Sequence, residues 1–395
     1  MTNEEWVAVA REAIMNNVGR FPIVINRGKG SRVWDADDKE YIDFLTGISV
    51  DNFGHSEPRI AAAIAAQAER IVHVSNYFYL EDQIKLAREL LRLSGFHRVY
   101  FGNSGAEANE AAIKLARKYG RETLGGRNGI VTAKNSFHGR TYGALSATGK
   151  PKYQENFLPI VPGIVHADFN SLEDWKAKID DNTCAILIEL VQGEGGVNPA
   201  DPGFIKGLRE ICQKRGILFM VDEVQTGLGR TGKMFAYEHY GFRPDVITIA
   251  KSLGGGVPCG AMLVNEDADV FKPGDHSTTI GGGGLAFAAG LVTLELLQTP
   301  GLMRQVIEKG QYIQAVWEKW RQELPVIQGY RGLGLMLALE LKVPSKPVAL
   351  RCLEEGLIVN AVTELAIRIL PALNIEQEDL DAGLEILKKV LTEFV

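Results

Sequence analysis

Two strand patterns between residues 217 and 251 constrain the fold of this chain most. The run Ile217–Val221 is apolar throughout and stops at Asp222, and a second β-prone run, Asp245–Ala250, stops at Lys251. Unbroken runs of this kind are typical of strands buried on both faces, as in a parallel sheet covered by helices. The sequence therefore predicts an α/β sheet with an aspartate and a lysine at the carboxyl ends of two strands.

The chemistry of these two side chains indicates a cofactor. Ligands of parallel sheets bind beyond the carboxyl ends of the strands. A lysine there can attach covalently to an aldehyde cofactor while a carboxylate keeps the cofactor ring protonated, so Asp222 and Lys251 suit pyridoxal phosphate. Either residue alone is more often a solvated strand end, and the pair indicates function only if the rest of a cofactor site is present.

Helical and strand patterns alternate on both sides of this stretch, which predicts an α/β fold of two domains. A large domain with a mostly parallel sheet between helices is expected at residues 59–300. A smaller α+β domain is expected from residues 1–58 together with 301–395. The predicted helices are 59–72, 81–93, 105–119, 203–215, 302–323 and 376–393, and the further predicted strands are 31–34, 40–44, 98–101, 129–133, 184–190, 334–341 and 366–370.

Composition excludes several classes of function. The 395 residues are 46% hydrophobic and carry a net charge of −6 without a basic stripe, which argues against nucleic-acid binding. The first residues lack the basic and apolar regions of a signal peptide, and the apolar stretch Gly281–Leu297 is short and carries Glu295. No membrane association and a cytoplasmic location are expected. The four cysteines lie far apart and no H-E-x-x-H occurs, so neither disulfides nor a metal site is expected.

A candidate phosphate cradle follows the strand predicted at 98–101. Gly102–Glu107 leads into an alanine-rich helix, and the unpaired N–H groups of a helix N-terminus suit a phosphate. Ser104 and Glu107 have the spacing of a capping box, which by itself would explain both residues. Gly105 allows close approach of the backbone to a ligand.

Several motifs resemble those of the class III aminotransferases of the acetylornithine type, in the family's order from about residue 20 to the end. They are Asn103–Glu110, Phe137–Thr141, Gln192–Val197, Asp222–Gly227, His276–Thr279 and Ile367–Pro371. The resemblance implies the fold of the fold-type I pyridoxal-phosphate transferases and a reaction that moves an amino group.

The resemblance also implies a role for each cofactor-binding residue. Lys251 would hold the cofactor covalently and move the proton, and Asp222 would face the ring nitrogen. Thr279 would reach the phosphate of the partner subunit, so a homodimer with shared active sites is implied. The remaining implied contacts are Val224 and Phe137 on the ring faces, Gln225 on the phenolic oxygen, Ser104, Gly105 and Ala106 on the phosphate, and Glu223 beside Asp222.

Two arginines concern the substrates. By resemblance, Arg368 grips the α-carboxylate of glutamate and Arg140 the far carboxylate, since a guanidinium binds a carboxylate in a bidentate fork. Glu194 would be a gate that pairs with Arg368 while an ω-amine reacts. Thr278 is also expected to contact the substrate.

The implied reaction moves the terminal amino group of N-acetylornithine to 2-oxoglutarate, giving N-acetylglutamate semialdehyde and glutamate in arginine biosynthesis. Residues 73–83 resemble the substrate-side segment of that subgroup. Ornithine, succinylornithine, a carrier-linked lysine and 4-aminobutyrate remain alternative donors.

The chain departs from the family pattern in two places. No proline follows Glu189, and the segment Ile280–Gly284 contains four glycines in place of an aromatic-Gly-Gly-Asn-Pro sequence. Glycines raise backbone freedom, so a flexible segment is expected beside Thr279.

Two other functions would fit parts of the sequence. Gly227–Gly232 is a literal G-x-G-x-x-G, which would suit a nicotinamide-dependent oxidoreductase, but four residues separate its first glycine from the strand end at Asp222. A non-enzymatic relic of an aminotransferase could have lost the lysine or the aspartate, whereas this chain keeps both.

Overall fold

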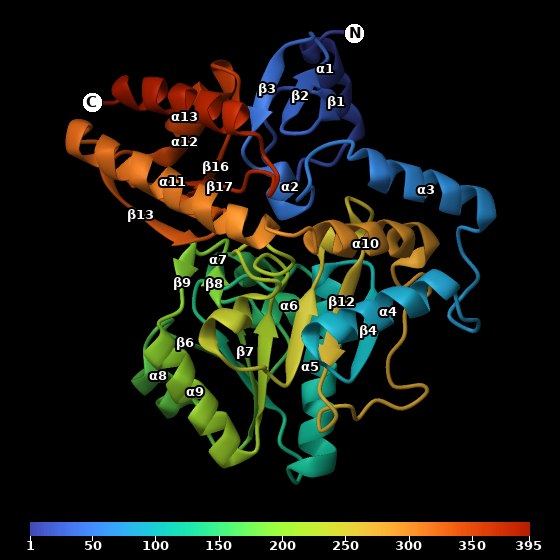
Figure 1. Cartoon of the computed structure of the whole chain (residues 1–395). Coiled ribbons are helices and arrows are strands. Elements are labelled where there is room, and N and C mark those ends of the chain that lie inside the picture. Colours follow the sequence, from blue (N-terminus) through green and yellow to red (C-terminus); the bar gives the residue numbers. More distant parts are fainter.

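A seven-stranded sheet forms the centre of the larger part of the molecule. The computed structural model describes all residues, 1–395. The strand order is β4-β12-β11-β10-β7-β5-β6, and only β12 runs antiparallel to its neighbours (Figure 1). The strands are β4 (Arg98–Gly102), β5 (Gly129–Ala133), β6 (Ile164–Ala167), β7 (Thr183–Glu189), β10 (Leu218–Asp222), β11 (Val246–Ile249) and β12 (Gly260–Val264).

The predicted parallel sheet is confirmed at its centre. Every residue of β5, β7, β10 and β11 is buried, as expected for strands covered on both faces. The antiparallel strand β12 was not predicted, because its five residues give no periodic signal that sets them apart from a loop. β7 ends at Glu189, where the missing proline was noted, and the short hairpin β8 (Val191–Gln192) and β9 (Asn198–Pro199) follows.

Helices cover both faces of this sheet. The alanine-rich face of α5 packs on β11 and β12, and α10 packs on α3 and α4. α5 extends four residues beyond the predicted end at 119. The helices are α3 (Pro58–Arg70), α4 (Glu81–Ser94), α5 (Gly105–Thr123), α6 (Tyr142–Ala147), α7 (Pro151–Gln154), α8 (Leu172–Lys178), α9 (Pro202–Arg215) and α10 (Gly283–Leu297).

The N- and C-terminal segments lie side by side above the sheet (Figure 1). Strand β15 pairs in parallel with β3, so residues from both ends of the chain share the sheet β1-β2-β3-β15. The N-terminal elements are α1 (Asn3–Ala13), β1 (Ile25–Lys29), β2 (Arg32–Asp35), β3 (Glu40–Asp43) and α2 (Thr46–Ser49). The C-terminal elements are α11 (Leu302–Glu323), β13 (Ile327–Leu333), β14 (Met336–Leu341), α12 (Ser345–Glu354), β15 (Leu357–Ile358), β16 (Asn360–Thr363), β17 (Ala366–Ile369) and α13 (Gln377–Thr392).

One apolar core connects these segments with the central sheet, since its largest cluster includes Ile42, Val221 and Leu391. The domain boundaries at 58 and 300 stay predictions. No single helix has the length and apolar character to cross a membrane. α10 and α11 meet both criteria only as a pair, which bends by 73° at the break between them.

Candidate active site

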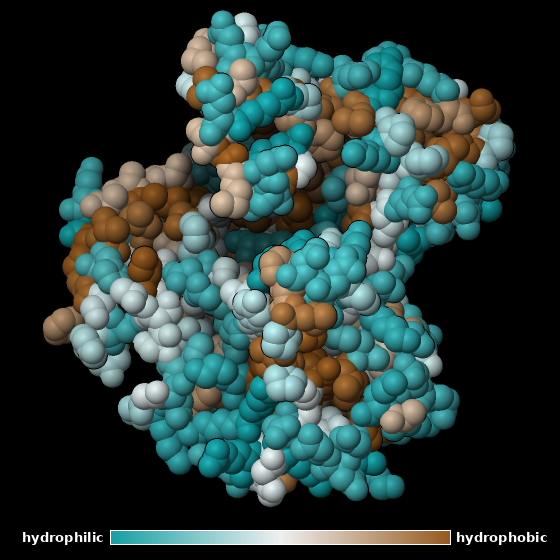
Figure 2. Space-filling view, turned by 180° about the vertical axis from the view of Figure 1, so that it is seen from behind, coloured by the Kyte–Doolittle hydropathy of each residue, from teal (hydrophilic) through white to brown (hydrophobic).

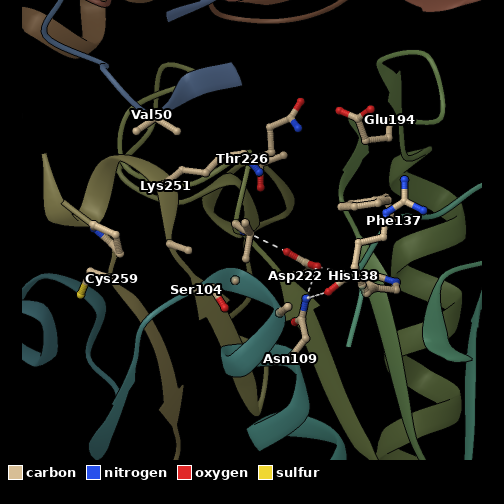
Figure 3. Close-up of a pocket in the computed structure, with 18 of the residues that line it drawn as sticks. Val50, Ser104, Asn109, Phe137, His138, Glu194, Asp222, Thr226, Lys251 and Cys259 are labelled. Carbon is tan, nitrogen blue, oxygen red and sulfur yellow. Dashed lines mark hydrogen bonds and ion pairs between the residues drawn. The ribbon is translucent and has the colours of Figure 1, made fainter. Parts of the chain in front are cut away.

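A cavity of about 480 Å³ opens at the carboxyl ends of β10 and β11, beside the N-terminus of α5 (Figure 3). Most residues predicted for the site surround it. They are Ser104, Gly105, Ala106, Phe137, Arg140, Glu194, Asp222, Val224, Gln225 and Lys251. The lining also contains Asn109, His138, Glu189, Thr226 and Cys259, to which the sequence had assigned no role.

Asp222 is the last residue of β10 and is almost fully buried. Its carboxylate lies 2.8 Å from Nδ1 of His138 and accepts hydrogen bonds from Asn109 Nδ2 at 2.8 Å and the Val224 N–H at 2.9 Å. Burial opposes the charged imidazole, but the hydrogen bond and charge of Asp222 outweigh it and raise the pKa of His138. These contacts fix the orientation of the Asp222 carboxylate at the cavity.

Lys251 follows β11 and lies across the cavity from Phe137 and Glu194 (Figure 3). Its φ of 49° is in the left-handed region, which a non-glycine residue adopts at a cost of about 1–3 kcal/mol. Burial lowers the pKa of its ammonium, although Asp222, Glu194 and Glu189 partly oppose the shift. The side chain is therefore biased toward a free amine.

The N-terminus of α5 meets the cavity through Ser104, Gly105 and Ala106. Ser104 Oγ accepts the Glu107 N–H at 3.1 Å, but the Glu107 carboxylate accepts the N–H of Asn103 at 2.7 Å rather than that of Ser104. The predicted capping box is thus only half formed, because the Glu107 side chain binds the N–H of Asn103, one residue before Ser104.

Two glycines allow this turn to lie where it does. A Cβ at Gly105 would stand 2.7 Å from Val224 Cγ1, and a Cβ at Gly260 of β12 would stand 2.2 Å from the Ser104 carbonyl oxygen. The helix N-terminus is therefore held against the sheet at van der Waals distance.

Arg368 lies in the middle of β17 and has no exposed surface. Its Nη1 donates to Glu194 Oε1 at 2.6 Å and to Gln225 Oε1 at 3.1 Å, and Nη2 donates to Asn360 Oδ1 at 2.8 Å. Burial raises the pKa of Glu194, yet the charge of Arg368 outweighs burial and lowers it overall. The pairing of Glu194 with Arg368 that the family resemblance implies is present in the structure.

Arg140 differs from Arg368 because no carboxylate lies within ion-pair distance of it. Its guanidinium stands 3.8 Å from the centre of the Tyr153 ring and 5.4 Å from that of Phe137. Stacking on the two aromatic rings fixes the arginine while leaving its N–H groups at the exposed side of the cavity.

Four predicted site residues do not line the cavity. One of them is Arg368, which contacts the lining residues Glu194 and Gln225. The prediction that Glu223 binds the cofactor needs correction. Its carboxylate is turned away from the cavity and accepts the N–H groups of Ala236 and Tyr237 at 2.9 and 2.8 Å. Thr278 and Thr279 lie on a surface loop, where Thr278 Oγ1 accepts a hydrogen bond from Asn103.

Glu189 is the other buried carboxylate of the site. It accepts the N–H groups of Phe137 and Gly193 but has no cationic hydrogen-bond partner, and burial raises its pKa to about 7.

The G-x-G-x-x-G segment does not open a helix. Turns follow β10, and Arg230 within the motif is fully buried, donating to Ser49 Oγ, Asn52 Oδ1 and the carbonyls of Leu335 and Pro371. The segment is a structural junction and not a dinucleotide-binding turn.

Known proteins match almost the whole length of this chain. The model of the family Aminotransferase class-III matches residues 13–391. The acetylornithine aminotransferase of Methanocaldococcus jannaschii is 46% identical over 395 residues, which are 100% of this chain and 99% of the relative. The acetylornithine aminotransferase of Caldanaerobacter subterraneus subsp. tengcongensis is 45% identical over 389 residues, 98% of this chain and 99% of the relative.

Among solved structures, the ornithine aminotransferase of Toxoplasma gondii with PLP at partial occupancy superposes with a TM-score of 0.96. It is 33% identical, and the match covers 99% of this chain and 94% of the other. The chain therefore belongs to the class III aminotransferases and, like them, depends on pyridoxal 5′-phosphate.

Proposed function

We propose that this enzyme transfers the terminal amino group of N-acetylornithine to 2-oxoglutarate, giving N-acetylglutamate semialdehyde and glutamate, as in arginine biosynthesis. The contrast between the two arginines supports this best. Arg140 carries no ion pair, whereas Glu194 neutralises Arg368. In this state the cavity suits a donor with one carboxylate far from its reacting amine. The curated relatives at 45–46% identity favour the acetylated donor.

The residues present fit the cofactor. The N-terminus of α5 at Ser104, Gly105 and Ala106 would hold the phosphate, and the Asp222 carboxylate would hold the ring nitrogen. Val224, Phe137 and Gln225 would complete its surroundings. When bound, pyridoxal phosphate supplies an electron sink for the bond that breaks at the substrate carbon.

The side chains of this site divide the remaining work. Lys251, whose pKa is lowered, can take a proton from the substrate carbon at Nζ and return it. Arg140 would bind the donor carboxylate, and Thr278 remains a proposed substrate contact. In the second half-reaction Glu194 would leave Arg368, which then binds the α-carboxylate of glutamate or 2-oxoglutarate.

We also propose a cytoplasmic homodimer in which Thr279 completes the partner's phosphate site. Thr279 is exposed and outside the cavity of its own chain. An exposed apolar cluster lies beside the loop that carries Thr279. The two are linked because Asn76, which precedes Tyr77 of the cluster, donates a hydrogen bond to the Thr278 carbonyl. Figure 2 shows apolar atoms gathered on the side of the molecule that carries α3 and α4. The cluster consists of Ile71, Val72, Tyr77, Phe78, Tyr79 and Ile280.

A panel of ω-amino donors with 2-oxoglutarate tests the substrate. N-acetylornithine should give the highest kcat/KM among N-acetylornithine, ornithine, succinylornithine, a carrier-linked lysine and 4-aminobutyrate. Equal or faster turnover of 4-aminobutyrate would overturn the substrate assignment, because 4-aminobutyrate lacks the acetylated amino group of N-acetylornithine.

Replacing Lys251 tests the chemistry. Lys251→Ala should lower kcat by about 10³-fold or more, since it removes the group that moves the proton. Borohydride should fix the cofactor covalently to the wild-type chain and not to the variant. Persistent turnover of Lys251→Ala would disprove the assigned role.

A further inference from the structure

Glu194 lies between two cavities. One is the active-site cavity, and the other has a volume of about 390 Å³ and shares only Glu194 with the first. The second cavity is also lined by Lys150, Lys152 and the exposed Glu364, together with Asn135, Pro151, Gly195, Val362 and Thr363. No part of the proposed reaction uses this second cavity.

Lys150 already contacts the gate residue. It lies at the start of α7 and is partly buried, and its Nζ donates to the backbone carbonyl of Glu194 at 2.6 Å. No carboxylate lies within ion-pair distance of this ammonium. Burial lowers the pKa of Lys150, and the charge of Glu194 is the largest effect that opposes the shift. The neighbouring Lys152 is exposed and makes no contact with Glu194.

The opening of the gate creates an electrostatic problem. Arg368 becomes available to a substrate carboxylate only when the Glu194 carboxylate leaves it. Moving an ionised carboxylate from a buried pair to a partly buried place without a counter-charge is unfavourable, because the desolvated charge is no longer compensated. A second cation within reach of the same side chain removes most of that cost.

The backbone around the gate favours movement of the side chain alone. The Lys150 ammonium tethers the Glu194 carbonyl, so the peptide stays in place. Only the side-chain torsions of Glu194 then have to change for its carboxylate to leave Arg368 and enter the second cavity.

We propose that Lys150 receives the carboxylate of Glu194 when the gate opens, so that one site serves both half-reactions. Lys150 is then a positioning residue, because it acts on the α-carboxylate of 2-oxoglutarate through Glu194 and Arg368. This inference rests on the proposed function of Glu194 as the gate.

The test compares the two half-reactions in Lys150→Met by stopped-flow absorbance of the cofactor. The kcat/KM for 2-oxoglutarate should fall about tenfold, and that for the ω-amino donor should stay within about twofold. The dissociation constant of glutarate, an unreactive dicarboxylate, should rise by a similar factor in calorimetry. Lys152→Met should leave all three quantities unchanged, and Lys150→Arg should restore them.

A second variant separates failure of this inference from failure of the gate. Glu194→Gln should by itself tighten glutarate binding, because a neutral amide releases Arg368. In the Glu194→Gln background, Lys150→Met should not change glutarate affinity further, because residue 194 then has no carboxylate for Lys150 to bind. An equal loss in both half-reactions of Lys150→Met, or a like effect of Lys152→Met, would overturn the role of Lys150. Unchanged glutarate affinity in Glu194→Gln would overturn the gate and this inference with it. A wild-type enzyme without either half-reaction would instead overturn the proposed function.

Discussion

At the scale of single residues, the two buried carboxylates of the cavity behave differently because their hydrogen-bond partners differ. Asp222 is surrounded by Asn109, His138 and the Val224 N–H, and these groups stabilise its charge. Glu189 has only two backbone N–H groups, and burial raises its pKa to about 7. The charge of Glu189 therefore changes with pH near neutrality.

The raised pKa of Glu189 makes stability depend on pH. An unfolded glutamate has a pKa of 4.5, so between 4.5 and about 7 the folded chain keeps a proton that the unfolded chain has lost. The free energy of unfolding therefore falls as pH rises through this window, by up to about 3 kcal/mol. Glu189→Gln, which cannot ionise, should gain that amount over the wild type between about pH 5 and pH 8 in urea unfolding of the cofactor-free protein. Glu354→Gln, on an exposed carboxylate, is the control; a gain for Glu189→Gln that is independent of pH would contradict the explanation.

At the scale of elements, β12 determines where α5 begins. The antiparallel pairing of β12 with β4 places Gly260 opposite Gly102, directly beneath the turn at Ser104. The glycine run before α10 has a related role. Gly281, Gly282 and Gly283 all have positive φ, and the N–H of Gly282 donates to Asn103 Oδ1. The glycine run thus forms a defined turn that packs against the N-terminus of α5. The backbone freedom expected from its sequence is what allows the positive φ values of this turn.

Gly260→Ala should displace the phosphate turn. Its Cβ would overlap the Ser104 carbonyl at 2.2 Å, so the helix N-terminus must shift. The dissociation constant of pyridoxal phosphate should rise about tenfold or more, because anion binding by helix N–H groups falls off within one turn. Fluorescence titration of the cofactor-free protein measures this. Gly19→Ala, where φ is not positive and an added Cβ meets nothing within 4 Å, is the control. Unchanged affinity in Gly260→Ala would show that the turn adapts.

At the scale of the whole molecule, Arg230 connects three parts of the chain. Its guanidinium donates to Ser49 and Asn52 from the N-terminal segment and to the carbonyls of Leu335 and Pro371 from the C-terminal segment. Since the arginine itself follows β10, one buried side chain holds both segments against the strand that bears Asp222.

Arg230→Met should therefore destabilise the fold. It leaves several buried acceptors without donors, which costs about 2–4 kcal/mol in the free energy of unfolding. Urea unfolding measures the loss, and Arg304→Met on the exposed face of α11 should change stability by less than about 0.5 kcal/mol. Equal stabilities of Arg230→Met and the wild type would rule out this role.

The shared active site of the proposed homodimer can be tested by mixing two inactive variants. Thr279→Val should lack the phosphate contact and Lys251→Ala the catalytic amine. A mixed dimer contains one site with both residues intact, so an equimolar mixture after subunit exchange should recover about a quarter of wild-type activity. If Thr279 served its own chain, each site would remain defective and mixing would restore nothing.

The order of residues along the chain predicted the central strands β5, β7, β10 and β11, several of the long helices and the chemistry at the strand ends. Buried parallel strands give continuous apolar runs, and helices give periodic ones, so local order along the chain predicted β10, β11 and α5 to within a few residues. The resemblance of ordered motifs to a known family then indicated Lys251, Asp222 and the pairing of Glu194 with Arg368, residues 174 positions apart.

Only the tertiary structure decided which side chains support that chemistry. The contacts of Asn109 and His138 with Asp222, the turning away of Glu223, the antiparallel β12 and the contact of Lys150 with Glu194 all join residues that no local pattern relates. A hydrogen bond or an ion pair depends on distances of a few tenths of an ångström, and these are set by how whole elements pack and not by the order of residues along the chain.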